Sequence, residues 1–150
     1  MARMPSCTLG TGTVYFGANS HGPELTFHRP KDEPIQGIGH RHDWESIVVW
    51  LSDQSTSASL LGLAVSAHGG YDTSTSPSLS GASPLVQYIS YFPLDHQLDF
   101  TPTQGGQQPL IAWESLPSIA QQALANTDFG DANVPFIDAN FLNNLAEASL

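Results

Sequence analysis

The sequence predicts a mainly β (α+β) fold, a β-sandwich with peripheral helices. Three observations support this prediction. The apolar runs are short and rich in valine and isoleucine, and stretches of serine, threonine, glycine and proline separate them. An apolar pattern with helical spacing occurs only toward the end of the chain. Because predicted strands and helices do not alternate, we do not expect a parallel sheet of βαβ units.

The first strands are predicted in the N-terminal half of the chain. Residues 1–30 contain only one short strand-like patch, at residues 13–16. Residues 47–51 form a continuous apolar run, which is typical of a strand buried on both faces. A second such run covers residues 60–66, and the polar stretch 52–59 between the two runs predicts a β-hairpin.

The later elements are a long loop, two strands and two helices. Residues 69–84 are rich in Ser, Thr, Gly and Pro and are expected to form a surface loop. Residues 85–92 and 110–113 are expected strands. A helix over residues 116–125 is expected, with Ser115 as its N-cap and Pro117 in its first turn. A last helix should follow Asp138 as its cap, with three apolar residues on it: Phe141, Leu142 and Leu145.

Composition indicates one globular domain with an acidic surface. The 150 residues are 40% hydrophobic, which is enough for a core, and their formal net charge is −10. With only 4 basic residues, the chain has no patch that could neutralise phosphates, so we expect no nucleic-acid partner. Cys7 is the single cysteine, so no intrachain disulfide can form. We find no apolar run near the roughly 18 residues of a membrane span, and no signal peptide at the start.

The densest polar cluster is the heptapeptide Gly-His-Arg-His-Asp-Trp-Glu at residues 39–45. Side chains of an extended segment alternate between faces, so Asp43 and Glu45 should point to the same side. Asp32, upstream across a Pro- and Gly-bearing loop, can fold back as a third carboxylate, and His40 can turn either way. Three carboxylates and one imidazole favour Ca²⁺ or Mg²⁺ over Zn²⁺.

The sequence of this cluster also allows simpler interpretations. The charges could be a solvated strand end, with Arg41 paired to Asp43 or Glu45, because short motifs also match by chance. Two histidines two residues apart suit zinc, but no third His or Cys lies nearby. A carboxylate pair could also perform hydrolysis, although no nucleophile motif accompanies it.

The heptapeptide resembles the signature of the necrosis- and ethylene-inducing peptide 1-like proteins, the NPP1 family of microbial cytolysins that act on plants. Four further segments resemble blocks of the same family and occur in the same order. They are residues 29–34 (RPKDEP), 66–71 (SAHGGY), 110–114 (LIAWE) and 126–136 (NTDFGDANVPF). The resemblance covers approximately residues 29–145.

The resemblance implies a fold similar to actinoporins and fungal lectins, and a toxin rather than an enzyme. Family members are secreted and carry a divalent cation in an acidic cavity. They bind the sugar head groups of plant plasma-membrane sphingolipids, the glycosylinositol phosphorylceramides, and then damage the membrane. The implied cation-site positions are Asp32, His40, Asp43 and Glu45. We therefore expect an extracellular protein, a monomer, with Ca²⁺ or Mg²⁺ as its cofactor.

The resemblance also implies a sugar- and membrane-binding region. A membrane-facing loop of the family corresponds to residues 92–96, where Asp95 and His96 match and Phe92 replaces the family's tryptophan. Phe lacks the indole N–H and the interfacial preference of Trp, so membrane docking should be weaker. His68 is the expected sugar contact. For Phe92 a core aromatic, and for His68 a hydrogen-bonded histidine beneath the sheet, are the structural alternatives.

The N-terminal part departs from the family pattern. Residues 1–28 replace the longer segment that family members carry, so we expect an N-terminally truncated member with its family domain over residues 29–150. Three hypotheses follow from the sequence. The chain is a cation-dependent cytolysin, a non-cytolytic relative that binds glycolipid or only elicits immunity, or a metal-dependent hydrolase.

Overall fold

The structure is a computed structural model, and it describes residues 13–19, 22–29, 32–35, 38–40, 42–53, 55, 57–91, 95–106 and 110–150. For residues before 42, and for Asp95 and Leu110, only the backbone is described. The strands are β1 (Thr13–Asn19), β2 (Gly22–Arg29), β3 (Asp32–Ile35), β4 (Ile38–His40), β5 (Asp43–Leu51), β6 (Leu60–Ala67), β7 (Gly70–Ser74), β8 (Leu79–Ser80), β9 (Ser83–Pro84), β10 (Val86–Tyr91), β11 (Asp95–Phe100) and β12 (Leu110–Ala112). A 3₁₀ turn at Trp113–Ser115 precedes α1 (Ser118–Asn126) and α2 (Asp138–Glu147).

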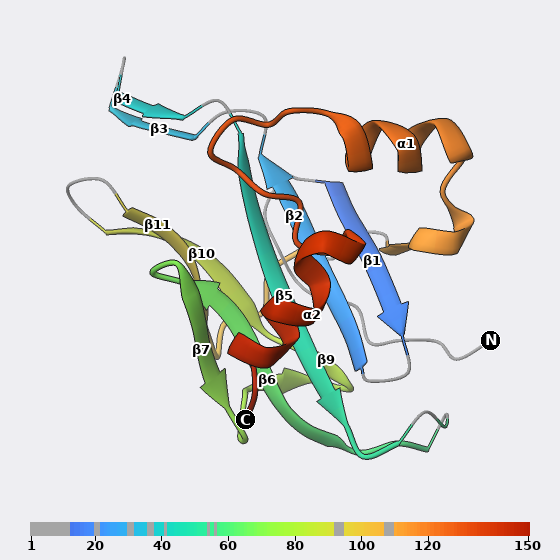
Figure 1. Cartoon of the computed structure of the whole chain (residues 1–150). Coiled ribbons are helices and arrows are strands. Elements are labelled where there is room, and N and C mark those ends of the chain that lie inside the picture. Colours follow the sequence, from blue (N-terminus) through green and yellow to red (C-terminus); the bar gives the residue numbers. More distant parts are fainter. Residues whose placement is uncertain are drawn as a thin grey trace.

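A six-stranded sheet forms the centre of the fold, with the strand order β12-β1-β2-β5-β6-β7 (Figure 1). Its strands pair antiparallel except for β1 and β12, which run parallel. The predicted hairpin of residues 47–51 and 60–66 is confirmed, since Ile47 of β5 pairs with Val65 of β6. Three separate two-stranded sheets complete the described strands: β3-β4, β8-β9 and β10-β11.

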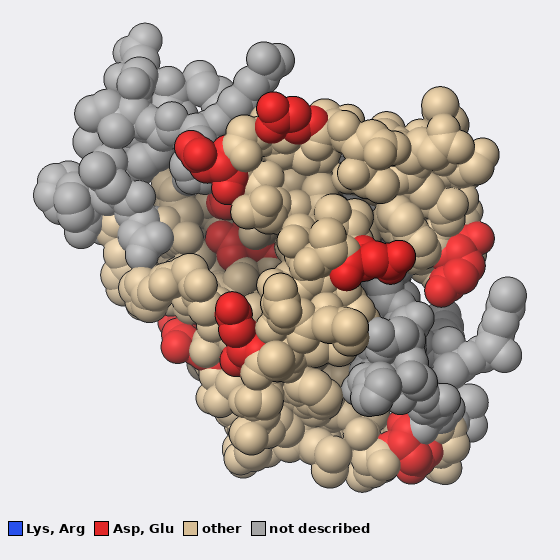
Figure 2. Space-filling model, in the orientation of Figure 1, with Lys and Arg blue, Asp and Glu red and all other residues tan. Residues whose placement is uncertain are grey.

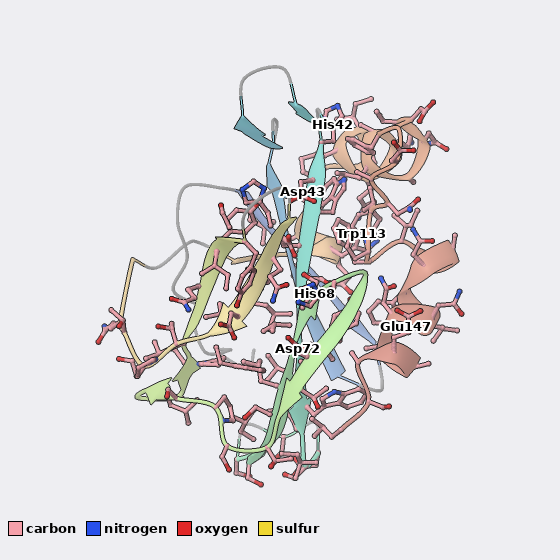
Figure 3. The ribbon with its side chains drawn as sticks, turned by 90° about the vertical axis from the view of Figure 1, so that its left-hand side faces the viewer. His42, Asp43, His68, Asp72, Trp113 and Glu147 are labelled. Carbon is pink, nitrogen blue, oxygen red and sulfur yellow. The ribbon has the colours of Figure 1, made fainter. Side chains whose placement is uncertain are left out.

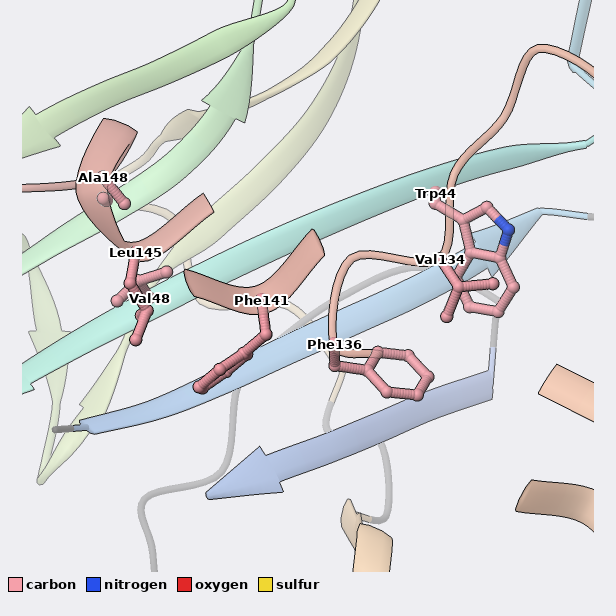
Figure 4. Packing of buried hydrophobic residues seen from close by; sticks show 8 residues of the cluster. Trp44, Val48, Val134, Phe136, Phe141, Leu145 and Ala148 are labelled. Carbon is pink, nitrogen blue, oxygen red and sulfur yellow. The ribbon is translucent and has the colours of Figure 1, made fainter. Parts of the chain in front are cut away.

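The core lies on both faces of the central sheet. On one face, the β10-β11 pair contributes Val86 and Leu98 to a cluster with Ile47 and Val49 of β5. On the other face, Trp44 and Val48 of β5 pack with the chain around residues 134–148 (Figure 4). Alternate β5 side chains thus enter different clusters, which confirms that this strand is buried on both sides. The predicted mainly β fold with peripheral helices is what the described elements form.

Helix α2 is fixed to the sheet by side chains near its end. Phe141 and Leu145 are its buried residues, as the sequence predicts. The indole N–H of Trp50 donates to the carbonyl of Ala148 at 2.8 Å, which ties the end of the helix to β5. A Cβ placed on Gly62 would lie 2.5 Å from Leu150 Cδ2, so the absence of a side chain there admits the C-terminal leucine.

Two expectations about the strands are wrong. The expected loop over residues 69–84 contains β7, β8 and β9; polar residues suffice in β7 because it lies at the edge of the sheet. The structure also finds long strands β1 and β2 where only residues 13–16 suggested one, and their hydrogen bonds to neighbouring strands outweigh weak local propensity.

The helix predictions are wrong in detail. Ser115 lies in the 3₁₀ turn and Pro117 is the N-cap of α1, because the residue before a proline, Leu116, is held in extended backbone. Ile119, one of the apolar residues of the predicted helix, is 73% exposed to solvent. On α2, Asp138 is the first helical residue rather than the cap, and Leu142 is 65% exposed. Among the described residues, no helix is long and apolar enough to span a membrane.

Candidate functional site

Asp43 begins strand β5 on the face of the sheet that the β10-β11 pair covers (Figure 3). The hydroxyl of Tyr88, on β10, donates a hydrogen bond to Asp43 Oδ2 at 3.2 Å. The ring of Tyr88 in turn stacks on the imidazole of His96, with ring centroids 5.4 Å apart and planes inclined by 18°. Two strands that are distant in sequence therefore meet at this carboxylate.

The next residue, Trp44, points to the opposite face of the sheet. Its ring contacts Phe129 edge-on at a centroid distance of 5.4 Å and Phe136 at 5.9 Å. His42 also meets Phe129 edge-on, at 5.2 Å. Asp43 and Trp44 thus point to opposite faces, as the alternation of an extended segment predicts, and His42 shares the Phe129 contact with Trp44. The carboxylates lie apart from an aromatic cluster that anchors the same strand.

Glu45 is a buried carboxylate, with only 6% of its surface exposed. Its Oε2 accepts a hydrogen bond from the hydroxyl of Ser66, on the neighbouring strand β6. The Ser66 oxygen also accepts a hydrogen bond from the backbone N–H of Ser46 at 3.0 Å. Burying a carboxylate is costly unless it is hydrogen-bonded or paired with a positive charge, and the Ser66 hydroxyl supplies such a hydrogen bond.

Asp32 and His40 are brought opposite each other by the β3-β4 pair. Their backbones are direct partners in its register, so the chain does fold back between them as the intervening Pro and Gly predict. Their side chains lie outside the described residues. Among the side chains that the structure describes, no group of three or more His, Cys, Asp or Glu is arranged to hold a metal ion. That search does not include Asp32 or His40, so the four-residue site stays a prediction.

His68 occupies the turn between β6 and β7. It and Gly69 are the two residues between the paired Ala67 and Gly70, and both have positive φ, 51° and 76°. This is the backbone of a type I′ hairpin turn, which a non-glycine residue adopts at a cost. The imidazole is exposed, with its centroid 6.2 Å from that of Tyr91. The alternative of a histidine beneath the sheet is therefore wrong.

The end of the β10-β11 pair is described only in part. Phe92, the expected membrane-contacting residue, lies outside the described residues. Tyr91 pairs with Asp95, and Ser90 with His96, so the last two residues of the predicted loop lie in strand β11. The His96 ring lies beside Tyr88, as described above, and the side chain of Asp95 is not described.

Sequence reasoning missed Tyr88 and Ser66 as partners of the carboxylates. Tyr88 lies in β10 between Val86 and Ile89, where nothing local distinguishes it from a core tyrosine. Ser66 stands out in the sequence only as the last residue of the run 60–66 and the first of the segment SAHGGY. Both contacts depend on which strands become neighbours, so only a correct prediction of the sheet order could have found them.

The formal charges in residues 42–150 are all negative. Residues 42–150 contain 11 Asp and Glu and not one Lys or Arg. Figure 2 shows the acidic side chains spread over one face of the molecule, with some inside and beside a hollow; no basic side chain is coloured among the described residues. Such a surface attracts cations and repels anions.

The chain matches the family model described as necrosis inducing protein (NPP1) over residues 25–148. It is 45% identical over 127 residues to NLP effector protein 10 of Phytophthora capsici, a match that covers 82% of this chain and 54% of that protein. It is 44% identical over 128 residues to necrosis-inducing protein NPP1 of Phytophthora nicotianae, with the same coverage. The chain therefore spans about half the length of these relatives.

Solved structures show the same fold. The complex of NLPPya with glucosamine has a TM-score of 0.86 and 34% identity, over 98% of this chain and 87% of that one. The non-toxic HaNLP3 protein has a TM-score of 0.85 and 30% identity, over 97% and 87% of the two chains. A structure described as a toxin fold as basis for microbial attack and plant defence is 44% identical, with a TM-score of 0.84, over 93% of this chain and 68% of that one. By sequence and by fold, this chain belongs to the necrosis-inducing protein (NPP1) family.

Proposed function

We propose that this chain is a cation-dependent cytolysin that binds the sugar head groups of plant glycosylinositol phosphorylceramides and damages the plasma membrane. Its site of action is then outside the cell that makes it, and it acts as a monomer. Support comes from relatives named as necrosis-inducing or effector proteins and from a similar structure solved with glucosamine. No step of this activity breaks a covalent bond, so the protein is not an enzyme.

The observation that carries the proposal is the environment of the two β5 carboxylates. Asp43 and Glu45 are one strand repeat apart, about 7 Å along the backbone. Glu45 is buried, and hydrogen bonds from Ser66 and Tyr88 hold the two carboxylates of this strand. At an effective dielectric constant near 20, two unit charges 7 Å apart repel by about 2 kcal/mol. A divalent cation would relieve that repulsion, and oxygen ligands of this kind suit Ca²⁺ or Mg²⁺.

The chain's residues would divide the work as follows. Asp43 and Asp32 would hold the cation directly, and His40 and Glu45 would do so directly or through water. A bound cation would supply positive charge and coordination positions for sugar hydroxyls. His68, Asp95 and His96 would contact the sugar. Phe92 would enter the membrane interface.

The test measures dye release from vesicles that contain plant glycosylinositol phosphorylceramide. We expect release by the wild-type chain, and its loss in EDTA and in Asp43→Asn, which keeps the shape and the Tyr88 hydrogen bond but removes the charge. The matched control is Glu147→Gln, an exposed acid on α2, across the sheet from Asp43 (Figure 3). Undiminished release by Asp43→Asn or in EDTA would refute the cation mechanism.

A second candidate function is glycolipid binding without membrane damage. Its support is the likeness to HaNLP3, which is described as non-toxic and resembles this chain almost as closely as the glucosamine-bound protein does. Sedimentation of the chain with the same vesicles separates the two functions. Binding with dye release supports a cytolysin, whereas binding without dye release supports the second candidate.

A further inference from the structure

The hydroxyl of Ser66 lies between two neighbouring residues of β5. The ladder between β5 and β6 ends at the pair Ile47 and Val65. One residue further along each strand, the backbone N–H of Ser46 donates to Ser66 Oγ at 3.0 Å. The Ser66 hydroxyl itself donates to Glu45 Oε2. The Ser66 side chain therefore continues the pairing of the two strands beside the buried Glu45 carboxylate.

The direction of these hydrogen bonds follows from their chemistry. A backbone N–H can only donate, so Ser66 Oγ is an acceptor toward Ser46 and keeps its own proton for Glu45. On the next strand, Tyr71 is the direct register partner of Ser66, and its hydroxyl lies 2.5 Å from Ser46 Oγ. Three strands are thus tied together beside Glu45, and the Ser66 hydroxyl has one orientation that satisfies both of its bonds.

We infer that Ser66 is a positioning residue, which holds the Glu45 carboxylate in the orientation that the proposed cation site requires. The inference rests on the proposed function, because Glu45 is there a cation ligand, directly or through water. A glutamate side chain has three rotatable bonds, and a fixed donor removes rotamers that point away from the site. Partners that orient a metal ligand in this way typically change metal affinity ten- to a hundredfold when they are removed.

The experiment compares Ser66→Thr with Ser66→Val. Both side chains are β-branched and nearly equal in shape, and both suit a strand, but only threonine keeps the hydroxyl. Calcium chloride and magnesium chloride are titrated into each variant and the wild type by calorimetry, without lipid. We expect Ser66→Thr to bind the cation like the wild type, and Ser66→Val to bind it at least tenfold more weakly. Near-ultraviolet circular dichroism confirms folding, and Ser66→Ala replaces Ser66→Val if the latter does not fold.

Two further variants separate positioning from a general effect on the strands. Ser46→Ala removes the partner of the Tyr71 hydroxyl but leaves the Ser66–Glu45 bond, so its cation affinity should equal that of the wild type. In the Glu45→Gln background, Ser66→Val should cause no further loss of affinity, because the two residues act as one unit.

The outcomes also distinguish a failure of this inference from a failure of the proposed function on which it rests. If the wild-type chain binds neither Ca²⁺ nor Mg²⁺, the proposed cation site fails. If the wild type binds the cation and Ser66→Val binds it equally well, the site stands and the role of Ser66 is overturned. An equal loss in Ser46→Ala and Ser66→Val would also overturn it, since the effect would then be that of the strand pairing.

Discussion

Replacing His68 by glycine tests whether this histidine serves function or structure. The imidazole is exposed, so its removal costs little burial, and its ring contact with Tyr91 is lost. An L-residue in the left-handed region costs about 1–2 kcal/mol, which glycine avoids. Glycine loses more conformational entropy on folding, by about 0.5–1 kcal/mol. The balance for His68→Gly therefore lies between no change and about 1.5 kcal/mol of added stability.

The assay is equilibrium unfolding in urea, followed by a glucosamine titration of the folded protein. We expect His68→Gly to be at least as stable as the wild type and to bind glucosamine more weakly. The control is Gly69→Ala: a Cβ at Gly69 meets no atom within 4 Å, so its cost is purely conformational, about 1–2 kcal/mol. A loss of more than about 1 kcal/mol in His68→Gly would refute this reasoning, because surface substitutions rarely cost that much. Unchanged glucosamine binding would exclude His68 as a sugar contact.

Two other predictions concern stability away from the site. Phe141→Ala should destabilise the protein by about 3–5 kcal/mol and Leu142→Ala by under about 0.5 kcal/mol in urea, because Phe141 is 8% exposed and its neighbour 65%. In the turn after β5, Ser55 and Ser52 donate hydrogen bonds to Asp53, with Ser55 the larger cause, and lower its pKa below 3.8. A lowered pKa means that the charged form stabilises the fold above pH 3.8, so Asp53→Asn should destabilise at pH 7. That difference should shrink as the pH falls through the lowered pKa, and a difference that does not change with pH would contradict the assignment.

The parts of the fold that depend on local pattern could be predicted from the sequence. The continuous apolar run at residues 47–51 predicts a strand buried on both faces, whichever strands flank it. Period-two alternation alone places Asp43 and Trp44 on opposite faces. β7 could not be recognised, because its polar residues become a strand only by pairing with β6. α1 begins later than its apolar spacing suggests, because a proline restricts the residue before it.

The candidate site, too, could be predicted from the sequence only in part. Its carboxylates stand out in the sequence because charged residues are scarce in this chain and crowd into residues 39–45. Their hydrogen-bond partners do not stand out. Tyr88 and Ser66 reach Asp43 and Glu45 across sequence separations of 45 and 21 residues, and those contacts follow from the packing of the strands. Sequence can identify the acids, but the groups that orient them emerge only with tertiary structure.

The pairing of β1 with β12 has a consequence for how the chain folds. Val14, Tyr15 and Phe16 pair with Leu110, Ile111 and Ala112, so the central sheet is completed by strands from opposite halves of the sequence. The Trp50–Ala148 hydrogen bond joins residues 98 positions apart. Such long loop closures are entropically costly, and proteins dominated by them fold in milliseconds to seconds rather than microseconds. During synthesis, β1 can pair with β2 early, but its pairing with β12 has to wait until residues 110–112 emerge.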